Sequence, residues 1–205
     1  MASADIPESS GAFPSSVREM AELGALYETH WSRLIAIMRH RVDPALGVRL
    51  DAEDIVNAAF LDARRRWTVY RADPKVSEFV WLYRLAKDRL IEEWRRATSQ
   101  KVNIQRNVPW PSHASVDLGL RLVAPETGPE QKAIRNEIVS SMQKALQELR
   151  EDDRDVIMMR SYEDLSFREI GELLGISENA ATVRHMRALR KLKDHWKRLT
   201  GESRP

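Results

Sequence analysis

Apolar residues recur three and four positions apart through most of the chain, the spacing that places them on one face of an α-helix. The first run covers residues 17–41 and ends before the segment VDPALG, whose proline and glycine interrupt the pattern. A second run covers residues 51–67, where Asp51 is suited to cap the first turn. A third follows at residues 78–98, after a predicted loop at residues 69–77. The N-terminal half is therefore expected to form three helices.

The second half of the chain opens with a segment of different character. Residues 99–129 contain prolines that interrupt any long helix, and only a short helical turn is expected there, near residues 116–123. Helical spacing returns afterwards, in runs at residues 130–149, 153–162, 166–174 and 177–199. No segment alternates between apolar and polar residues as a half-buried strand would. We expect an all-α fold of two small helical domains joined by a linker: a flexible tail (1–18), an N-terminal domain (19–98), the linker (99–129), a C-terminal domain (130–199) and a final tail (200–205).

The composition is that of a soluble globular protein and narrows the possible chemistry. Of 205 residues, 42% are hydrophobic and 31% are charged, and the formal net charge is only +2. A role in nucleic-acid binding must therefore rest on where the positive charge lies. The absence of cysteine excludes disulfides and thiolate metal sites. No apolar run approaches the roughly 20 residues of a membrane span, and no signal peptide is evident, so we expect a cytoplasmic protein with no membrane partner.

The segment SFREIGELLGISENAATVRHMRALRKLK has the sequence features of a helix–turn–helix unit. Ser166 and Glu169 have the spacing of a capping box, so a short helix is expected to begin there. Gly175 suits the left-handed position that ends such a helix. Ser177 then caps a second, longer helix, as in helix–turn–helix motifs.

The second of these helices is strongly basic. Between Arg184 and Arg198 it carries seven cations and a single acidic residue, Asp194. A basic helix that is held at its N-terminus by a short partner helix is the arrangement that enters the major groove of DNA. The alternative is a solvated basic face, because the helix dipole also favours positive charge near a C-terminus. The capping box, the turn and the concentrated charge together favour DNA contact.

Two parts of the chain resemble bacterial sigma factors. The segment ALQELREDDRDVIMMRSYEDLSFREIGELLGISENAATVRHMRALRKLK is similar to the promoter-reading C-terminal domain of that family. Independently, LDAEDIVNAAFLDARRRW followed by FVWLYRLAKDRLIEEWRR is similar to the N-terminal sigma domain. A chain with only these two domains, in this order, resembles the extracytoplasmic-function (ECF) group. The resemblance covers residues 20–98 and 130–198.

The resemblance implies a protein that binds core RNA polymerase and directs it to promoter DNA. In the family, the second helix of the N-terminal domain docks on a coiled coil of the largest polymerase subunits. The matching positions here are Asp51, Glu53, Asp54, Asn57 and Phe60. Acidic residues around a few apolar ones suit docking between helices, although the acidic residues alone would also serve an ordinary helix start. The family often has Gln where Asn57 stands.

The resemblance also implies that the third helix and the loop before it read and open the promoter minus-ten element. Separated DNA strands need planar groups to stack on the bases and cations to bind the backbone. The matching residues are Tyr70, Arg71 and Lys75 in the loop and Arg84, Lys87, Asp88 and Arg95 in the helix. We expect these helix residues to be exposed, and Trp81 and Trp94 to be core residues. The family usually has Asn where Asp88 stands, and a carboxylate cannot donate hydrogen bonds to a base.

The basic helix of the C-terminal domain corresponds to the part of the family that reads the minus-thirty-five element as duplex DNA. Its N-terminal half is expected to face base edges. The base-facing candidates are Asn179, Thr182, Val183, Arg184, Met186 and Arg187, and the phosphate-binding candidates are Arg168, Ser177, Arg190 and Lys191. Arg184 has a structural alternative, as an ion-pair partner of an acidic neighbour such as Glu169. His185 stands where the family usually has an apolar residue, and we expect it to be packed and hydrogen-bonded.

The sequence alone is also compatible with other functions. One is a stand-alone helix–turn–helix regulator that binds duplex DNA as a dimer, which would leave the N-terminal half without a role. Another is a scaffold whose basic helix only solubilises it. An enzyme is disfavoured, because the five histidines lack metal-ligand spacing and no Walker loop, Rossmann fingerprint or serine elbow is present. We expect no metal, no cofactor and no small-molecule substrate. The family is often held by an anti-sigma factor that clamps between the two domains, and the long linker makes such a partner feasible.

Overall fold

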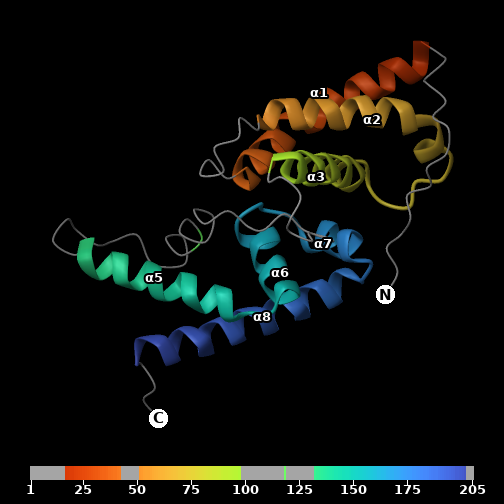
Figure 1. Ribbon diagram of the computed structural model, residues 1–205. Coiled ribbons are helices and arrows are strands. Elements are labelled where there is room, and N and C mark those ends of the chain that lie inside the picture. Colours follow the sequence, from red (N-terminus) through yellow and green to blue (C-terminus); the bar gives the residue numbers. More distant parts are fainter. Residues whose placement is uncertain (1–16, 43–50, 98–117, 119–131, 202–205) are drawn as a thin grey trace.

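The structure is a computed structural model, and it describes residues 17–42, 51–97, 118 and 132–201. All the secondary-structure elements in these ranges are helices, which confirms the all-α prediction (Figure 1). The helices are α1 (Val17–Arg41), α2 (Ala52–Ala72), α3 (Glu78–Ala97), α5 (Lys132–Glu148), α6 (Glu151–Ser161), α7 (Phe167–Leu174) and α8 (Glu178–Thr200). Most of the predicted linker, including nearly all of its expected helical turn, lies outside the described residues.

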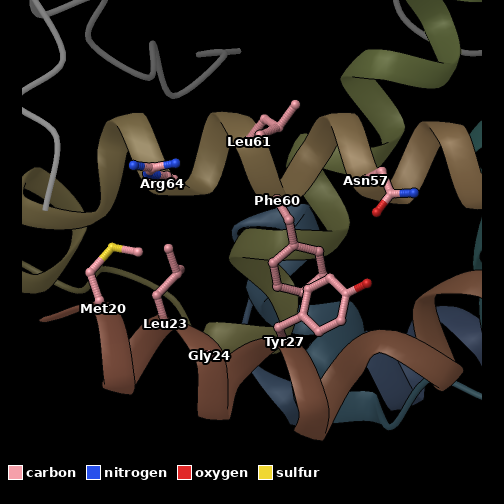
Figure 2. Close-up of a pocket in the computed structure, with 8 residues that line it drawn as sticks. All are labelled: Met20, Leu23, Gly24, Tyr27, Asn57, Phe60, Leu61 and Arg64. Atoms are coloured by element: carbon pink, nitrogen blue, oxygen red, sulfur yellow. The ribbon is translucent and has the colours of Figure 1, made fainter. Parts of the chain in front are cut away.

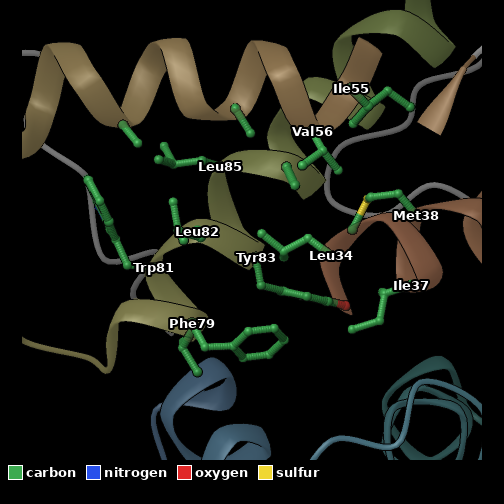
Figure 3. Close-up of a cluster of buried hydrophobic side chains, with 14 of the residues drawn as sticks. Leu34, Ile37, Met38, Ile55, Val56, Phe79, Trp81, Leu82, Tyr83 and Leu85 are labelled. Atoms are coloured by element: carbon green, nitrogen blue, oxygen red, sulfur yellow. The ribbon is translucent and has the colours of Figure 1, made fainter. Parts of the chain in front are cut away.

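The first three helices form an N-terminal bundle around a common apolar core (Figure 3). Leu34 and Met38 of α1, Val56 of α2, and Leu82 and Leu85 of α3 all lie in this core with almost no exposed surface. Each buried side chain of this size contributes about 1.5–3 kcal/mol relative to an exposed one, so the three helices depend on one another. The expected burial of the two tryptophans of α3, Trp81 and Trp94, is confirmed.

Helix α2 extends further than its sequence pattern predicts. The pattern ends the helix near Trp67, whereas α2 continues to Ala72. The added turn packs against α3, because the ring of Tyr70 stacks on that of Trp81 at 4.1 Å and Trp67 lies 6.1 Å from the same ring. Tyr70 therefore belongs to a helix, and the loop that was expected from residue 69 begins only at Asp73.

The last four helices form the C-terminal unit, in which α8 packs against α5, α6 and α7. Its core includes Leu146 of α5, Ile157 and Met158 of α6, and Leu192 of α8. Leu118, which lies in the predicted linker, is fully buried in this core. At least one position of the linker therefore packs with the C-terminal helices.

The two helical units are in direct contact. Figure 1 shows α6 and α7 on the side of α8 that faces the N-terminal bundle, with α7 below α3. Met159, Leu165 and Ile170 from the C-terminal unit are buried in the same continuous apolar cluster as the residues of α1–α3. The linker pattern alone does not predict this contact. No helix in the described part of the chain is long and apolar enough to cross a membrane.

Candidate nucleic-acid and polymerase interfaces

The helix–turn–helix unit is built from local caps that the sequence predicts. Ser166 accepts a hydrogen bond from the Glu169 amide at 3.2 Å, and the Glu169 carboxylate accepts one from the Ser166 amide at 2.7 Å, which confirms the capping box. Helix α7 ends at Gly175, whose φ of 67° lies in the left-handed region. The Ser177 hydroxyl accepts from the Ala180 amide at 3.1 Å and starts α8. The predicted turn therefore sets where α8 begins.

Gly171 is a structural residue of this unit that the sequence reading missed. A Cβ atom at this position would lie 2.8 Å from the carbonyl oxygen of Ile176 and 3.3 Å from the amide nitrogen of Glu178. A residue without a side chain thus lets α7 pack directly against the backbone of the turn. The signal in the sequence was a glycine in the interior of a short helix, a position where glycine is unfavourable without a packing reason.

Helix α8 has two distinct faces. The inward face buries Ala181, His185, Ala188 and Leu192. The outward face is exposed over the same turns and carries Asn179, Val183, Met186, Arg187 and Arg190. The predicted residues Thr182 and Arg184 are partly buried at the border between the faces. Most of the predicted base-facing residues therefore lie on one exposed stripe that starts at the helix cap.

Ion pairs neutralise part of the positive charge of α8. Arg184 lies 3.7 Å from Asp152, and the Lys191 ammonium donates to Asp153 at 2.6 Å. Burial would raise the pKa of Asp153, but the hydrogen bond and charge of Lys191 dominate and lower it. The cations of α8 that have no ion pair with a described residue are Arg187, Arg190, Lys193 and Lys197. Lys191 is thus ion-paired with α6, whereas Arg187 and Arg190 have no ion pair with a described residue and can contact DNA phosphates or bases.

The structural alternative for Arg184, an ion pair with an acidic neighbour, is confirmed, but the partner is Asp152 of α6 and not Glu169. Glu169 is bound instead by Arg33 of α1, whose two terminal nitrogens donate to its carboxylate at 2.6 and 2.9 Å. Burial would raise the pKa of Glu169, but the hydrogen bonds from Arg33 and from the start of α7 lower it. Arg168, a predicted phosphate contact, is exposed and pairs with Glu172 at 3.2 Å.

His185 is packed, as predicted, but the prediction of a hydrogen bond is wrong. Its ring lies 5.3 Å from that of Phe167, and neither of its nitrogens has a hydrogen-bond partner among the described residues. Burial, together with the nearby charge of Arg160, lowers the pKa of His185. The residue therefore acts as a neutral core side chain that joins α7 to α8.

The predicted minus-ten residues of α3 divide into two groups. Asp88 and Arg95 are exposed, as expected. The expectation is wrong for Arg84 and Lys87, which are only partly exposed. Arg84 donates to the carbonyl oxygen of Glu172 at 2.6 Å, at the C-terminal end of α7. Burial and the charge of a nearby arginine lower the pKa of Lys87. The C-terminal unit covers this part of α3.

Tyr70 and Arg71, two of the three residues predicted for the α2–α3 loop, line a cavity of about 720 Å³. Tyr70 is fixed beside it, because its ring stacks on Trp81 and its hydroxyl donates to the Val76 carbonyl oxygen at 2.8 Å. Burial raises the pKa of Tyr70 to about 12, so the hydroxyl stays protonated. Arg71 and Lys75 are exposed, and they pair with nearby carboxylates at 2.9 and 3.8 Å. The end of α2 thus supplies the aromatic Tyr70 and the exposed cation Arg71, and of the three predicted residues only Lys75 lies in the loop.

The predicted polymerase surface of α2 borders an apolar groove between α1 and α2, with a volume of about 460 Å³ (Figure 2). Asn57 and Phe60 both line it. Phe60 itself is mostly buried, because its ring packs edge-on against Tyr27 at 4.5 Å. Its neighbour Leu61 is instead 58% exposed. Figure 2 shows the Leu61 side chain pointing away from α1. The sequence reading missed Leu61.

The acidic residues of this surface lie at the start of α2. Asp51 caps the helix by accepting a hydrogen bond from the Glu53 amide at 2.8 Å, as predicted. Glu53 also pairs with Arg39 of α1 at 2.9 Å, and Asp54 is exposed. Asp51 therefore caps the helix and Glu53 forms an ion pair, in addition to any role in binding. Across the described ranges, no three or more His, Asp or Glu residues cluster in a way that could hold a metal ion.

Comparison with known proteins agrees with both halves of this arrangement. Residues 26–100 match the family described as Sigma-70 region 2, and residues 140–192 match Sigma-70, region 4. The ECF RNA polymerase sigma factor SigF of Caulobacter vibrioides is 30% identical over 82% of this chain and 82% of its own length. SigW of Bacillus subtilis is 29% identical over 71% of this chain and 77% of its own, and the RNA polymerase sigma-H factor of Pseudomonas aeruginosa is 27% identical over 67% and 69%. The chain therefore belongs to the ECF group of RNA polymerase sigma factors and directs promoter-specific transcription initiation.

Proposed function

We propose that three separate surfaces divide the work of this sigma factor. The exposed side of α2 binds core RNA polymerase, α3 and the loop before it bind the minus-ten element, and α8 binds the minus-thirty-five element. The observation that carries the proposal is the exposed stripe of α8, which starts at the Ser177 cap and lies opposite the face that packs on α5–α7. A helix held in this way presents its N-terminal turns to the major groove.

Within α8, Arg187 is the leading candidate for direct base contact. It is exposed, has no ion pair with a described residue and lies beside the exposed Met186 and one turn from Val183. An arginine that donates two hydrogen bonds to guanine contributes about 1–3 kcal/mol of discrimination. The apolar neighbours suit contact with thymine methyl groups.

On α2, Leu61 and the acidic first turn form the proposed polymerase surface. Leu61 is the exposed apolar centre, Asn57 lies one turn before it, and Asp54 adds negative charge toward the N-terminus. Apolar centres with polar rims are typical of docking surfaces between proteins. This surface lies on a different helix from the proposed minus-thirty-five surface, so the two activities are separable by mutation.

The test is run-off transcription with purified core RNA polymerase, with core binding measured in parallel. We expect Leu61→Asp to weaken core binding at least tenfold, because a charge replaces the exposed apolar centre. Arg187→Ala should leave core binding unchanged and reduce promoter-specific transcripts about 5- to 100-fold. Arg198→Ala is the matched control, because Arg198 is a similarly exposed cation in the last turn of α8, paired with Glu148. Equal losses in both assays for Leu61→Asp and Arg187→Ala would refute the division of surfaces.

The proposal extends to the cellular setting. Core RNA polymerase and promoter DNA are the partners, which implies a cytoplasmic location. The proposal needs no catalytic residue. An anti-sigma factor that inserts between the two domains is a further proposed partner, and isolation of a complex that blocks both core binding and transcription would test it.

A further inference from the structure

The methionines that the structure describes fall into two groups by exposure. Met186 of α8 and Met20 of α1 are 58% and 44% exposed. The others are at most 8% exposed and belong to the two apolar cores: Met38, Met142, Met158 and Met159. Figure 3 shows Met38 among the buried side chains of the N-terminal bundle. Solvent therefore reaches the thioether at only two of the described positions.

Met186 lies within the exposed stripe of α8 that is proposed to read the minus-thirty-five element. Arg187 follows it directly, the 40% exposed Val183 lies one turn before it, and the exposed Arg190 lies one turn after it. The core of the C-terminal unit is formed by the opposite face of the helix, which includes Leu192. Met186 thus has no packing role in this core, and a flexible apolar side chain at its position suits contact with a thymine methyl group.

The chain contains no cysteine. A thiolate is the usual first target of an oxidant in a protein, and no thiol is present here to react ahead of methionine. The exposed thioethers of Met186 and Met20 are therefore the sulfur atoms that the described part of the chain presents to a dissolved oxidant. The four buried methionines are shielded by the side chains packed around them.

We propose, on the basis of the proposed role of α8, that Met186 is an oxidation site at which a peroxide reversibly weakens reading of the minus-thirty-five element. The sulfur lone pair attacks one oxygen of hydrogen peroxide, so that an S–O bond forms as the O–O bond breaks. The hydroxide that leaves takes the proton from the transferred oxygen, and the products are methionine sulfoxide and water. Sulfur loses two electrons and the peroxide gains them.

The sulfoxide changes the chemistry of the stripe at one point. It replaces an apolar thioether by a polar group whose oxygen accepts hydrogen bonds and donates none. Against a thymine methyl group this oxygen has no partner, and it loses the water that solvates it in the free protein. The contact therefore becomes unfavourable while the helix keeps its buried face. Methionine sulfoxide reductases reverse the change, so the loss is recoverable.

Met20 provides an internal comparison on a different surface. It lines the apolar groove between α1 and α2, as Figure 2 shows, and this groove borders the proposed polymerase surface. Oxidation of Met20 changes a wall of that groove and leaves α8 untouched. Replacing Met20 by leucine therefore removes any effect of the oxidant on core binding through this residue and isolates the effect of Met186.

The test uses the full chain with Met20→Leu and purified core RNA polymerase. The sigma factor is treated with hydrogen peroxide, catalase removes the excess, and peptide mapping by mass spectrometry measures the sulfoxide at each methionine. Core polymerase is then added, and core binding and run-off transcripts are measured. We expect Met186 to oxidise about tenfold faster than Met38 or Met158, because those two are buried. As Met186 is converted, promoter-specific transcripts should fall about fivefold or more, with core binding unchanged.

The matched control carries Met20→Leu and Met186→Leu together, and each variant is compared with its own untreated sample. Without a thioether at position 186, treatment should reduce transcripts less than about twofold, because leucine is not oxidised. Equal losses in the two variants would overturn the proposal, as would full conversion of Met186 with no loss of transcripts. If the double variant transcribes too little to measure, repair decides. Methionine sulfoxide reductases of both epimer specificities must then restore transcripts as the Met186 sulfoxide disappears, and no recovery would overturn the proposal.

Protection by DNA separates this proposal from the proposed role of α8. Promoter DNA bound to the holoenzyme should slow the oxidation of Met186 about fivefold or more, because the stripe then faces base edges. Absence of protection would refute the role of α8 itself, and the oxidation proposal would fall with it. Protection combined with undiminished transcription after oxidation would overturn the oxidation proposal alone.

Discussion

Substitution of Gly171 by alanine should destabilise the helix–turn–helix unit, although alanine is the better helix former. The new Cβ would lie 2.8 Å from the Ile176 carbonyl oxygen, so backbone must move by about 0.6 Å to reach the 3.4 Å of ordinary contact. A backbone atom cannot rotate away as a side chain does, and overpacking of this kind costs about 1–3 kcal/mol. The gain in helix propensity offsets about 1 kcal/mol of that cost. We expect a net loss of up to about 2 kcal/mol in the free energy of unfolding.

The assay is urea unfolding followed by circular dichroism, with a matched glycine as control. With a slope of about 2 kcal/mol per molar urea, the midpoint of Gly171→Ala should fall by up to about 1 M. Gly24 is also helical, but a Cβ there meets nothing within 4 Å, so Gly24→Ala should raise the midpoint. Because the shift displaces α8, Gly171→Ala should also weaken duplex binding about threefold or more. A midpoint that rises equally in both variants would refute the steric argument.

Two further predictions concern charge. Duplex binding by the full chain should weaken as salt rises, with a slope of about −4 to −5 in log affinity against log salt if about four to six phosphates are neutralised. Arg187→Ala should make this slope shallower by about one. A slope near zero in titrations by fluorescence anisotropy would mean that α8 does not contact phosphates. The lowered pKa of His185 means that the unfolded chain binds its proton more readily. The free energy of unfolding should therefore fall as pH drops below about 6.5, and level off below the folded pKa. His185→Leu should flatten this part of the pH profile in urea titrations; a profile as steep as that of the wild type would show that other groups cause it.

The sequence by itself determined the features that depend on residues three or four positions apart. The Ser166 capping box, the Gly175 turn and the two faces of α8 all follow from local hydrogen bonds and helical periodicity, and the structure has each of them where the pattern predicts it. Which of the neighbours Phe60 and Leu61 is exposed on α2 did not follow in this way. It depends on Tyr27 of another helix, which covers the ring of Phe60.

Only the tertiary structure decided which charged side chains remain available. Arg84 and Lys87 are polar positions on α3 that the helical pattern assigns to solvent, but both are partly buried, and Arg84 is bound by α7 from 88 residues away. Arg41 and Glu163 look like ordinary surface charges in the sequence, but they form the buried centre of the contact between the two units. Helical periodicity predicts which face of a helix is apolar, because the apolar face is set by the sequence of that helix alone. The partner of a charged side chain depends on how whole helices pack against one another. That packing cannot be predicted from residues three or four positions apart.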